Sequence, residues 1–199
     1  MAFAGPRASI SGVSVGDSAC HLTIDDLVLG LHAIDEATPT ARLSLIVRRN
    51  GDDNVREVVE RARLTVERGL AGDAWERRLP LNPDAQLAVM STPIAALVAN
   101  GQPVTLFGDN LFVDLDLSAE KLPVGTRVRI GGAVLEVTPK PHNGCKKFVG
   151  RFGADALAFV ASKELRPRNL RGIYFRVIED GDVAIGDRIE ILGPRTIAD

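Results

Sequence analysis

One cysteine in a loop rich in glycine and lysine is the residue best suited to chemistry in this 199-residue sequence. Cys145 stands within residues 141–148, which read PHNGCKKF. Cationic neighbours such as His142 and Lys146 favour the thiolate, which is the form of cysteine that attacks electrophiles and binds metals. The loop therefore indicates a nucleophile or a metal ligand. The alternative is that Cys145 is a small buried hydrophobic residue, as most free cysteines are.

A strand and a helix are predicted on either side of this loop, over residues 134–138 and 154–161. Pro139 and Pro141 end the strand, because proline has no backbone N–H to donate. Gly144 permits a sharp turn of the backbone directly before the cysteine. We therefore expect the sulfur to lie on a connection that leads from a sheet into a helix.

Composition and charge restrict the classes of function. The chain is 45% hydrophobic and 25% charged, which is ordinary for a globular protein, and its length suits one substantial core. A net charge of -2 and 5% aromatic residues argue against nucleic-acid binding. No apolar run approaches the roughly 20 residues that cross a bilayer, so no membrane association is expected. We predict a cytoplasmic protein with free thiols, as a monomer or small homo-oligomer.

Several helices and strands can be predicted from local patterns. A helix is expected over residues 23–32, with Thr23 as its cap and acidic residues in its first turn. Residues 43–48 and 86–90 are predicted strands, whereas residues 56–64 fit a strand or a helix. A hydroxyl cap at residues 91–92 and Pro93 predict a second helix that ends at Asn100. Residues 1–16 are predicted to form a flexible tail, and residues 50–53 a turn.

Glycine-rich turns predict a protein built mainly of strands. Residues 131–132 and 180–181 indicate two hairpins, the second of which would pair residues 172–178 with residues 183–191. Residues 108–110 are expected to follow a strand and to lead into another at residues 111–117. Many short strands with a few short helices predict a mainly β (α+β) fold, a closed or partly closed twisted β-barrel.

A further glycine loop at residues 69–75 precedes Arg77 and Arg78. It fits a simple turn followed by two solvated charges. It also fits a close approach of backbone to a ligand, with arginines that bind anionic groups. The three histidines show no spacing typical of a zinc site.

The chain resembles the MOSC domain, named after the C-terminal region of molybdenum-cofactor sulfurase, and is most similar to stand-alone bacterial members. The resemblance extends from Leu43 to Leu192 and implies a MOSC β-barrel domain over residues 40–195. Residues 1–39 would form an N-terminal extension with a short helix. The motifs that carry the resemblance occur in a specific order and spacing, at residues 69–73, 108–111, 116–118, 122–125, 142–148, 171–174 and 183–187.

This resemblance implies roles for individual residues. Cys145 matches a family cysteine that binds the molybdenum of the molybdenum cofactor (molybdopterin) or carries persulfide sulfur. Asn110 matches a family position near the cofactor. The remaining candidate cofactor-binding residues lie at or beside motif positions, and they are Asp73, Arg77, Asp109, His142, Lys146 and Arg171.

Three functions remain open from the sequence. The first is binding of the molybdenum cofactor or transfer of sulfur, with Cys145 as metal ligand or persulfide carrier. The second is reduction of N-hydroxylated compounds with the same cofactor and an external electron donor. The third is a non-catalytic barrel that binds a partner. The expected partners are a cysteine desulfurase or an electron-transfer protein. Pyridoxal phosphate would belong to the desulfurase, and none is expected in this chain.

Overall fold

A computed structural model describes residues 9–10, 16–49, 55–77 and 79–194. The predicted turn at residues 50–53, Arg78 and most of the predicted tail at residues 1–16 lie outside the described residues. Ser9 and Ile10 of that tail form the short strand β1, which pairs with β3, so a wholly flexible tail is wrong at these two residues.

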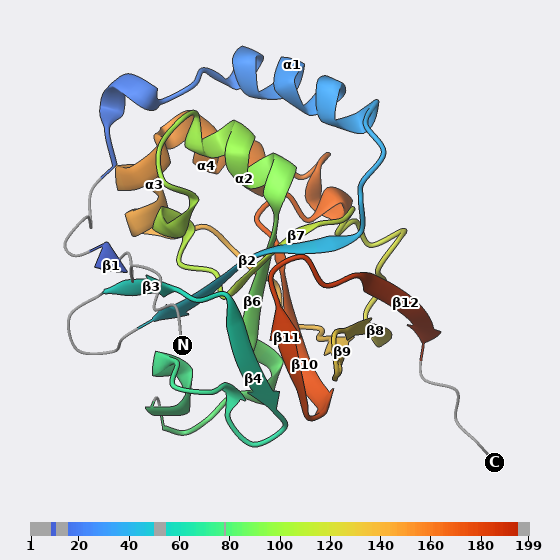
Figure 1. The fold of residues 1–199 in the computed structure, drawn as a ribbon. Coiled ribbons are helices and arrows are strands. Elements are labelled where there is room, and N and C mark those ends of the chain that lie inside the picture. Colours follow the sequence, from blue (N-terminus) through green and yellow to red (C-terminus); the bar gives the residue numbers. More distant parts are fainter. Residues whose placement is uncertain (1–8, 11–15, 50–54, 78, 195–199) are drawn as a thin grey trace, which may run out of the picture.

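Strands curl into a partly closed barrel, with a layer of helices packed over one end (Figure 1). Nine strands form one sheet in the order β1-β3-β2-β7-β6-β10-β9-β8-β12, and three form a second sheet in the order β11-β4-β5. Strands β6 and β7 run parallel, and every other described pair is antiparallel. The strand bounds are β1 Ser9–Ile10, β2 Arg42–Arg49, β3 Arg56–Val58, β4 Arg61–Thr65, β5 Gly69–Leu70, β6 Leu87–Ser91, β7 Leu111–Asp114, β8 Thr126–Ile130, β9 Ala133–Val137, β10 Ile173–Glu179, β11 Gly181–Ala184 and β12 Ile189–Pro194.

Backbone hydrogen bonds bring the two ends of the barrel together. Leu43 N–H donates to the Asp187 carbonyl at 2.9 Å, and Ile189 N–H donates to the Ala41 carbonyl at 2.7 Å. These bonds join the start of β2 to the start of β12, which removes part of the exposed edge that an open sheet would leave. The predicted mainly β barrel is therefore confirmed.

Burial alternates along the barrel strands and fills the barrel with aliphatic side chains. Along β10, Ile173, Phe175 and Val177 are buried, while the residues between them are only half-buried. This period of two is what a strand with one face on a core requires. The same cluster takes in Leu43, Leu87 and Leu135 from other strands, so the barrel has its own hydrophobic core.

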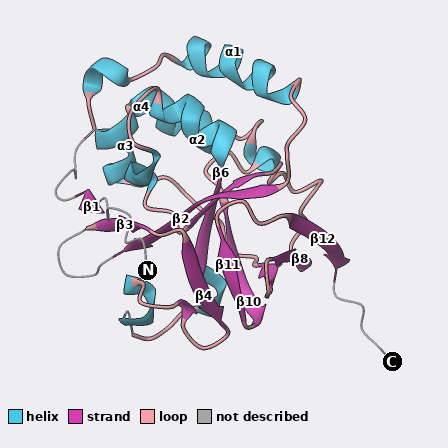
Figure 2. Cartoon of the chain, viewed as in Figure 1, coloured by secondary structure: helices cyan, strands magenta, loops and turns pink. Residues whose placement is uncertain are grey.

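The helices gather on one side of the strands (Figure 2), and a second hydrophobic core joins their buried side chains to those of β2, β6 and β7. Leu27 and Leu31 of the first helix meet Phe107, Phe152 and Phe159 there. Among the described residues, no helix has both the length and the apolar character needed to cross a membrane. The helix bounds are α1 Ile24–Asp35, α2 Thr92–Ala99, α3 Lys146–Phe152 and α4 Ala154–Ala161, with short 3-10 helices η1 Ser18–Cys20, η2 Ala74–Arg77, η3 Pro83–Ala85, η4 Val104–Phe107 and η5 Arg166–Arg168.

Helix α1 begins as the sequence predicted. The Thr23 hydroxyl accepts a hydrogen bond from the Asp26 N–H, and the Asp26 carboxylate accepts one from the Thr23 N–H. This reciprocal capping box satisfies backbone groups that have no partner within the helix. At α2, Asn100 ends the helix in a left-handed conformation, as expected, but Ser91 makes no capping hydrogen bond, so the predicted hydroxyl cap is wrong.

The second predicted hairpin is also wrong. Strand β10 pairs with β9 on one side, whereas on the other side its residues 173–175 pair with β6 and the Val177 N–H donates to the Gln86 side chain. Strand β11 therefore pairs with β4, and β12 pairs with β8. The first predicted hairpin, β8–β9 around Gly131, is confirmed. Residues 108–110 follow η4 rather than a strand, and β7 ends at Asp114, earlier than predicted.

Candidate functional site

Cys145 is an exposed free cysteine at the N-cap of α3, a helix that the sequence patterns did not predict. Its thiol makes no capping hydrogen bond, and Lys146 and Lys147 beside it are exposed. Gly144 does not have a positive φ, but a side chain there would place its Cβ 2.3 Å from Leu157 Cδ1. The glycine therefore lets the loop pack closely against α4, and the loop holds the sulfur at the surface.

Gly16 and Asp17 of the N-terminal extension are hydrogen-bonded to α3, Gly16 directly and Asp17 through Gln102. Gln102, 9% exposed, accepts a hydrogen bond from Asp17 N–H at 2.7 Å and donates one to the Arg151 carbonyl at 3.1 Å. Gly16 N–H donates to the Gly150 carbonyl at 3.2 Å. This part of the N-terminal extension therefore holds the helix that begins at Cys145.

Four arginines and two aspartates form one group next to this helix. We call them the arginine cluster, and its members are Arg49, Arg56, Arg151, Arg171, Asp73 and Asp109. Burial lowers the pKa of Arg151, Arg171 lowers it further, and a charge on Cys145 raises it. Burial also lowers the pKa of Arg56, with Arg151 as the next cause. These couplings link the sulfur to the arginine cluster.

Asp73 holds Arg49 within this cluster. The guanidinium of Arg49 donates to both carboxylate oxygens, with Nη2 2.5 Å from Oδ2, and the Arg49 and Trp75 N–H groups donate as well. Burial raises the pKa of Asp73, but the hydrogen bonds and charge of Arg49 outweigh it and leave this pKa below its usual range. Asp73 therefore acts on the site through Arg49.

Asp109 holds Arg171 in the same way. Arg171 Nη1 lies 2.9 Å and 3.2 Å from the two oxygens of Asp109, and these side chains are 10% and 0% exposed. The guanidinium also lies over the rings of Phe107 and Phe148, 5.7 Å and 5.4 Å from their centroids. Its Nε is buried without a hydrogen-bond partner. Arg171 is thus fixed in place and keeps one donor available.

His142 completes this buried group. Its Nδ1 lies 3.5 Å from Asp109 Oδ1, and its ring packs against Tyr174 with centroids 4.4 Å apart. Burial lowers the pKa of His142 to about 4, because loss of solvent outweighs the attraction of Asp109. The imidazole is therefore neutral at pH 7, although the sequence suggested a cationic neighbour for Cys145.

The buried imidazole predicts a pH effect on stability. The unfolded chain binds a proton on His142 near pH 6.5, whereas the folded chain resists it down to about pH 4. Stability from this residue is therefore complete above pH 6.5 and falls as the pH drops towards 4. Between pH 6.5 and 5 the loss should be about 1.5 kcal/mol. Urea unfolding at these two pH values should show this loss in the unaltered chain and a smaller one in His142→Phe. Equal losses in both proteins would contradict the prediction.

A pocket of about 360 Å³ opens beside the cysteine loop. Residues 141–144, Leu157 and Val160 of α4, and Arg171 and Gly172 line it. A Cβ on Gly172 would lie 2.2 Å from the Val89 carbonyl oxygen, and its φ is +93°, so the backbone here requires glycine. The loop before Cys145 therefore has a pocket at its side that is lined by a fixed arginine.

The structure brings together some of the candidate residues and separates others. Cys145, Lys146, His142, Asp109 and Arg171 lie in and around this loop, and Asp73 joins them through Arg49. Asn110 is fully buried, and its side-chain amide accepts from Ala88 N–H at 3.1 Å and donates to the Val47 carbonyl at 3.4 Å.

The two hydrogen bonds of the Asn110 side chain connect it to β6 and β2. Arg77 is exposed on η2, which lies at the far end of the barrel from α3 in Figure 1. The structure therefore does not bring Arg77 to the cysteine loop.

Sequence reasoning did not identify Arg49, Arg56 and Arg151 as members of the site. They come from β2, β3 and α3, which are far apart in the chain, and no motif connects them. One local signal existed for Arg151, which stands six residues after Cys145, within one short helix.

The fold and the site define a class of protein: a partly closed β-barrel that presents an exposed cysteine at the start of a helix, beside a buried arginine cluster. The family model described as "MOSC domain" matches residues 61–190, and the chain belongs to this family.

One curated protein is similar in sequence over part of the chain. The uncharacterized protein YflK of Bacillus subtilis (strain 168) is 33% identical over 86 residues, which are 43% of this chain and 36% of YflK. The matched part of the chain thus spans little more than a third of that relative.

Two crystal structures show a similar fold. The YuaD protein of Bacillus subtilis superimposes with a TM-score of 0.55 at 17% identity, over 78% of this chain and 97% of YuaD. YiiM of Geobacillus stearothermophilus gives a TM-score of 0.50 at 15% identity, over 77% of this chain and 74% of YiiM. At these identities the likeness concerns the fold alone.

Proposed function

We propose that this MOSC domain binds the molybdenum cofactor, with Cys145 as a ligand of the metal. The observation that carries the proposal is that exposed Cys145 begins the short helix α3, and that the same helix carries Arg151, a buried member of the arginine cluster. A thiolate is a soft ligand suited to such a metal, and guanidinium groups bind phosphate oxygens in fixed geometry. A site that joins both features suits a cofactor that carries a metal and a phosphate.

The residues present fit such a group in charge and in hydrogen bonding. Guanidinium groups of the arginine cluster, two of them held in place by Asp73 and Asp109, suit the binding of an anion. Arg171 Nε and His142 Nδ1 are buried without hydrogen-bond partners, and a polar ligand would satisfy them. Cys145 is exposed, so a metal can reach its sulfur without displacing the core.

Each side chain has a separate task in this proposal. Cys145 holds the metal, Lys146 lies exposed beside it as a mobile cation, and Arg151 and Arg171 bind anionic oxygens. Asp73 and Asp109 orient Arg49 and Arg171 and keep them from swinging towards solvent. The cofactor, when bound, would supply the capacity for two-electron or oxygen-atom chemistry. Neutral His142 would accept or donate one hydrogen bond from its ring nitrogen.

Metal and pterin analysis of the whole chain tests this proposal. Protein purified from cells that make the molybdenum cofactor should contain about one molybdenum and one pterin per chain. The same protein from cells that cannot make the cofactor should contain neither. Absence of both from the first preparation would overturn the proposal, and cyanide-labile sulfur on Cys145 without molybdenum would support a sulfur carrier instead.

Reduction of N-hydroxylated compounds is the second candidate, and the pocket of about 360 Å³ beside the cysteine loop favours it over pure storage of the cofactor. A compound in that pocket would contact Arg171 and the loop that ends at Cys145. This function needs an external electron-transfer protein, whereas sulfur transfer would need a cysteine desulfurase. Turnover of the molybdenum-loaded chain with an added electron-transfer system distinguishes the two.

A further inference from the structure

The pocket of about 360 Å³ beside the cysteine loop is formed by a basic part of an acidic chain. Four of the five lysines in the sequence lie in residues 140–163, and residues 139–171 contain eight Lys and Arg against two Asp and Glu. Because the whole chain has a net charge of -2, the rest of the sequence is acidic. A cleft surrounded by charge of one sign raises the local concentration of ligands of the opposite sign.

Five exposed cations lie on the segments that form this pocket. Arg166 lines the pocket itself, at the start of η5. Lys140 and Lys163 each stand next to a residue that lines it, and Lys146 and Lys147 begin α3. All five side chains are exposed, and none forms an ion pair with another described residue. Their charges are therefore available to a ligand.

No carboxylate is among the described residues that line this pocket. Two carboxylates lie beside lining residues, and both already have a partner. Asp109 is bound by Arg171, and Glu164 Oε2 accepts from the Ser162 hydroxyl at 2.7 Å. The Asp109 carboxylate offsets the charge of Arg171, so Arg166 is the cation in the lining that remains for a ligand.

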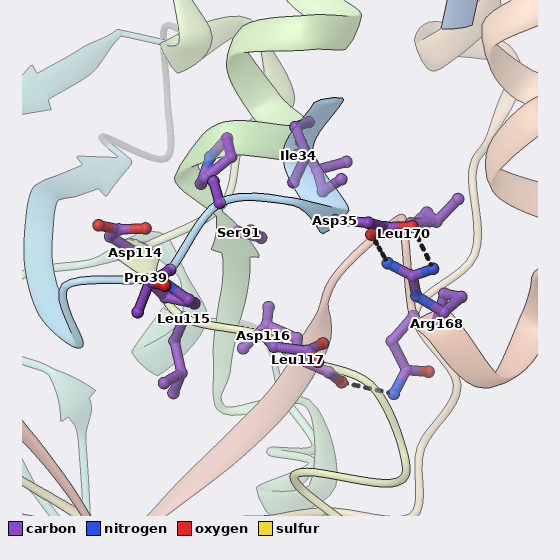
Figure 3. Close-up of a pocket in the computed structure, with 15 residues that line it drawn as sticks. Ile34, Asp35, Pro39, Ser91, Asp114, Leu115, Asp116, Leu117, Arg168 and Leu170 are labelled. Carbon is purple, nitrogen blue, oxygen red and sulfur yellow. Dashed lines mark hydrogen bonds and ion pairs between the residues drawn. The ribbon is translucent and has the colours of Figure 1, made fainter. Parts of the chain in front are cut away.

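A neighbouring pocket of about 150 Å³ has the opposite character (Figure 3). The two pockets share Asn169 and Leu170. The smaller one is lined by three aspartates and one arginine, Arg168, which donates to both oxygens of Asp35. An anion is therefore expected in the larger pocket and not in the smaller one.

His142 indicates that the ligand in the larger pocket is polar. It lines the pocket, and its side chain is 7% exposed. Its Nδ1 is buried without a hydrogen-bond partner, and a Cβ on Gly172, which also lines the pocket, would lie 3.3 Å from this atom. A buried polar atom without a partner is costly, so a ligand that supplies a hydrogen bond here would be stabilised.

Helix α4 gives the same pocket an apolar wall. Leu157 and Val160 both line it, and residues three apart on a helix lie on one face. Pro141 and Leu170 add further apolar surface. A cavity of about 150 Å³ already accommodates benzene, so this pocket is large enough for a ring together with a charged group.

We propose that this pocket binds a small organic carboxylate with an apolar body. The carboxylate would bind the guanidinium of Arg166, whose N–H donors match both oxygens, and the body would pack on Leu157 and Val160. An inorganic anion would leave the apolar wall exposed to water. The role of such a compound as a substrate rests on the proposed function, whereas its binding does not.

Three probes test the ligand class in NMR titrations at low salt. The full chain is purified from cells that cannot make the molybdenum cofactor, so the result does not depend on cofactor binding. Benzoate should bind at least about tenfold more tightly than benzyl alcohol, which has no charge, and should shift the methyl signals of Leu157 and Val160. Equal binding of the two probes, or no binding of benzoate, would overturn the proposal. Displacement of benzoate by an equal concentration of inorganic phosphate would also overturn it, because the apolar body would then contribute nothing.

The molybdenum-loaded chain separates this proposal from the proposed function. Benzoate should bind the loaded chain with the same affinity as the unloaded one. Loss of benzoate binding on loading would assign the pocket to the cofactor and contradict a separate ligand. A chain that binds benzoate but never contains molybdenum would overturn the proposed function and leave this pocket as a carboxylate site.

Variants locate the site. Arg166→Gln keeps hydrogen-bond donors but removes the charge, and it should weaken benzoate binding about fivefold. Arg61→Gln removes the same charge from an exposed position on β4, outside this pocket, and should leave the affinity unchanged. Cys145→Ala should bind benzoate normally, because the sulfur does not line the pocket. An equal loss in Arg61→Gln would show a general charge effect and rule out a carboxylate site at Arg166.

Discussion

Replacement of Cys145 by alanine is expected to remove molybdenum from the purified chain without unfolding it. The sulfur is exposed and makes no capping hydrogen bond, so its loss leaves no buried cavity and should change the free energy of unfolding by less than about 0.5 kcal/mol. Loss of a group that only orients a metal ligand costs about 10- to 100-fold in affinity. Loss of the ligand itself should lower the molybdenum content at least as much, as measured by elemental analysis.

Cys20→Ala is the matched control, because this second free cysteine is half-buried on η1. It should retain molybdenum. Cys145→Ser tests the softness of the ligand, since a hydroxyl of similar size does not replace a thiolate for a soft metal site. Full molybdenum content in Cys145→Ala would show that the sulfur is not a ligand, and the arginine cluster alone would then have to account for binding.

Features set by neighbouring residues were predictable from the sequence. Thr23 and Asp26 stand three residues apart and cap α1 reciprocally, and Gly131 has the positive φ that a tight hairpin needs. Alternating burial along β10 follows from its alternating side chains. These features depend on interactions between residues that are close in the sequence, so they can be predicted from the sequence alone.

Features that depend on distant pairing were not predictable in the same way. Asp180 and Gly181 looked like a hairpin turn, yet β10 pairs with β6 and β9, and β11 after the turn pairs with β4. The arginine cluster likewise gathers residues from β2, β3 and α3, together with Arg171 ahead of β10. Local turn propensity is a weak preference, and sheet pairing in three dimensions overrides it.

The candidate site residues show the same difference between local features and features that depend on distant residues. The cysteine loop was identifiable because its residues are contiguous, whereas the roles of Asp73 and Asp109 are visible only through Arg49 and Arg171. His142 shows most clearly that the charge of a side chain cannot be predicted from its sequence neighbours alone. Its sequence neighbours suggested a cation, but burial lowers its pKa to about 4.

The Asp109–Arg171 pair predicts the largest effect on stability. The carboxylate is 0% exposed and the guanidinium 10%, so Asp109→Ala leaves a buried positive charge without its partner. Such a loss costs about 3–5 kcal/mol. Urea unfolding at pH 7 should show a decrease of this size, whereas Asp182→Asn, which breaks an exposed ion pair, should cost less than about 1 kcal/mol.

The double variant Asp109→Ala/Arg171→Met separates the lost pair from the stranded charge. Methionine keeps most of the apolar contact with Phe107 and Phe148 but carries no charge, so the double variant should regain much of the stability lost in Asp109→Ala. A double variant no more stable than the single one would mean that solvent already reaches Arg171. Arg171 would then not be held in place by Asp109, and its proposed role as a fixed anion-binding group beside Cys145 would lose its physical basis.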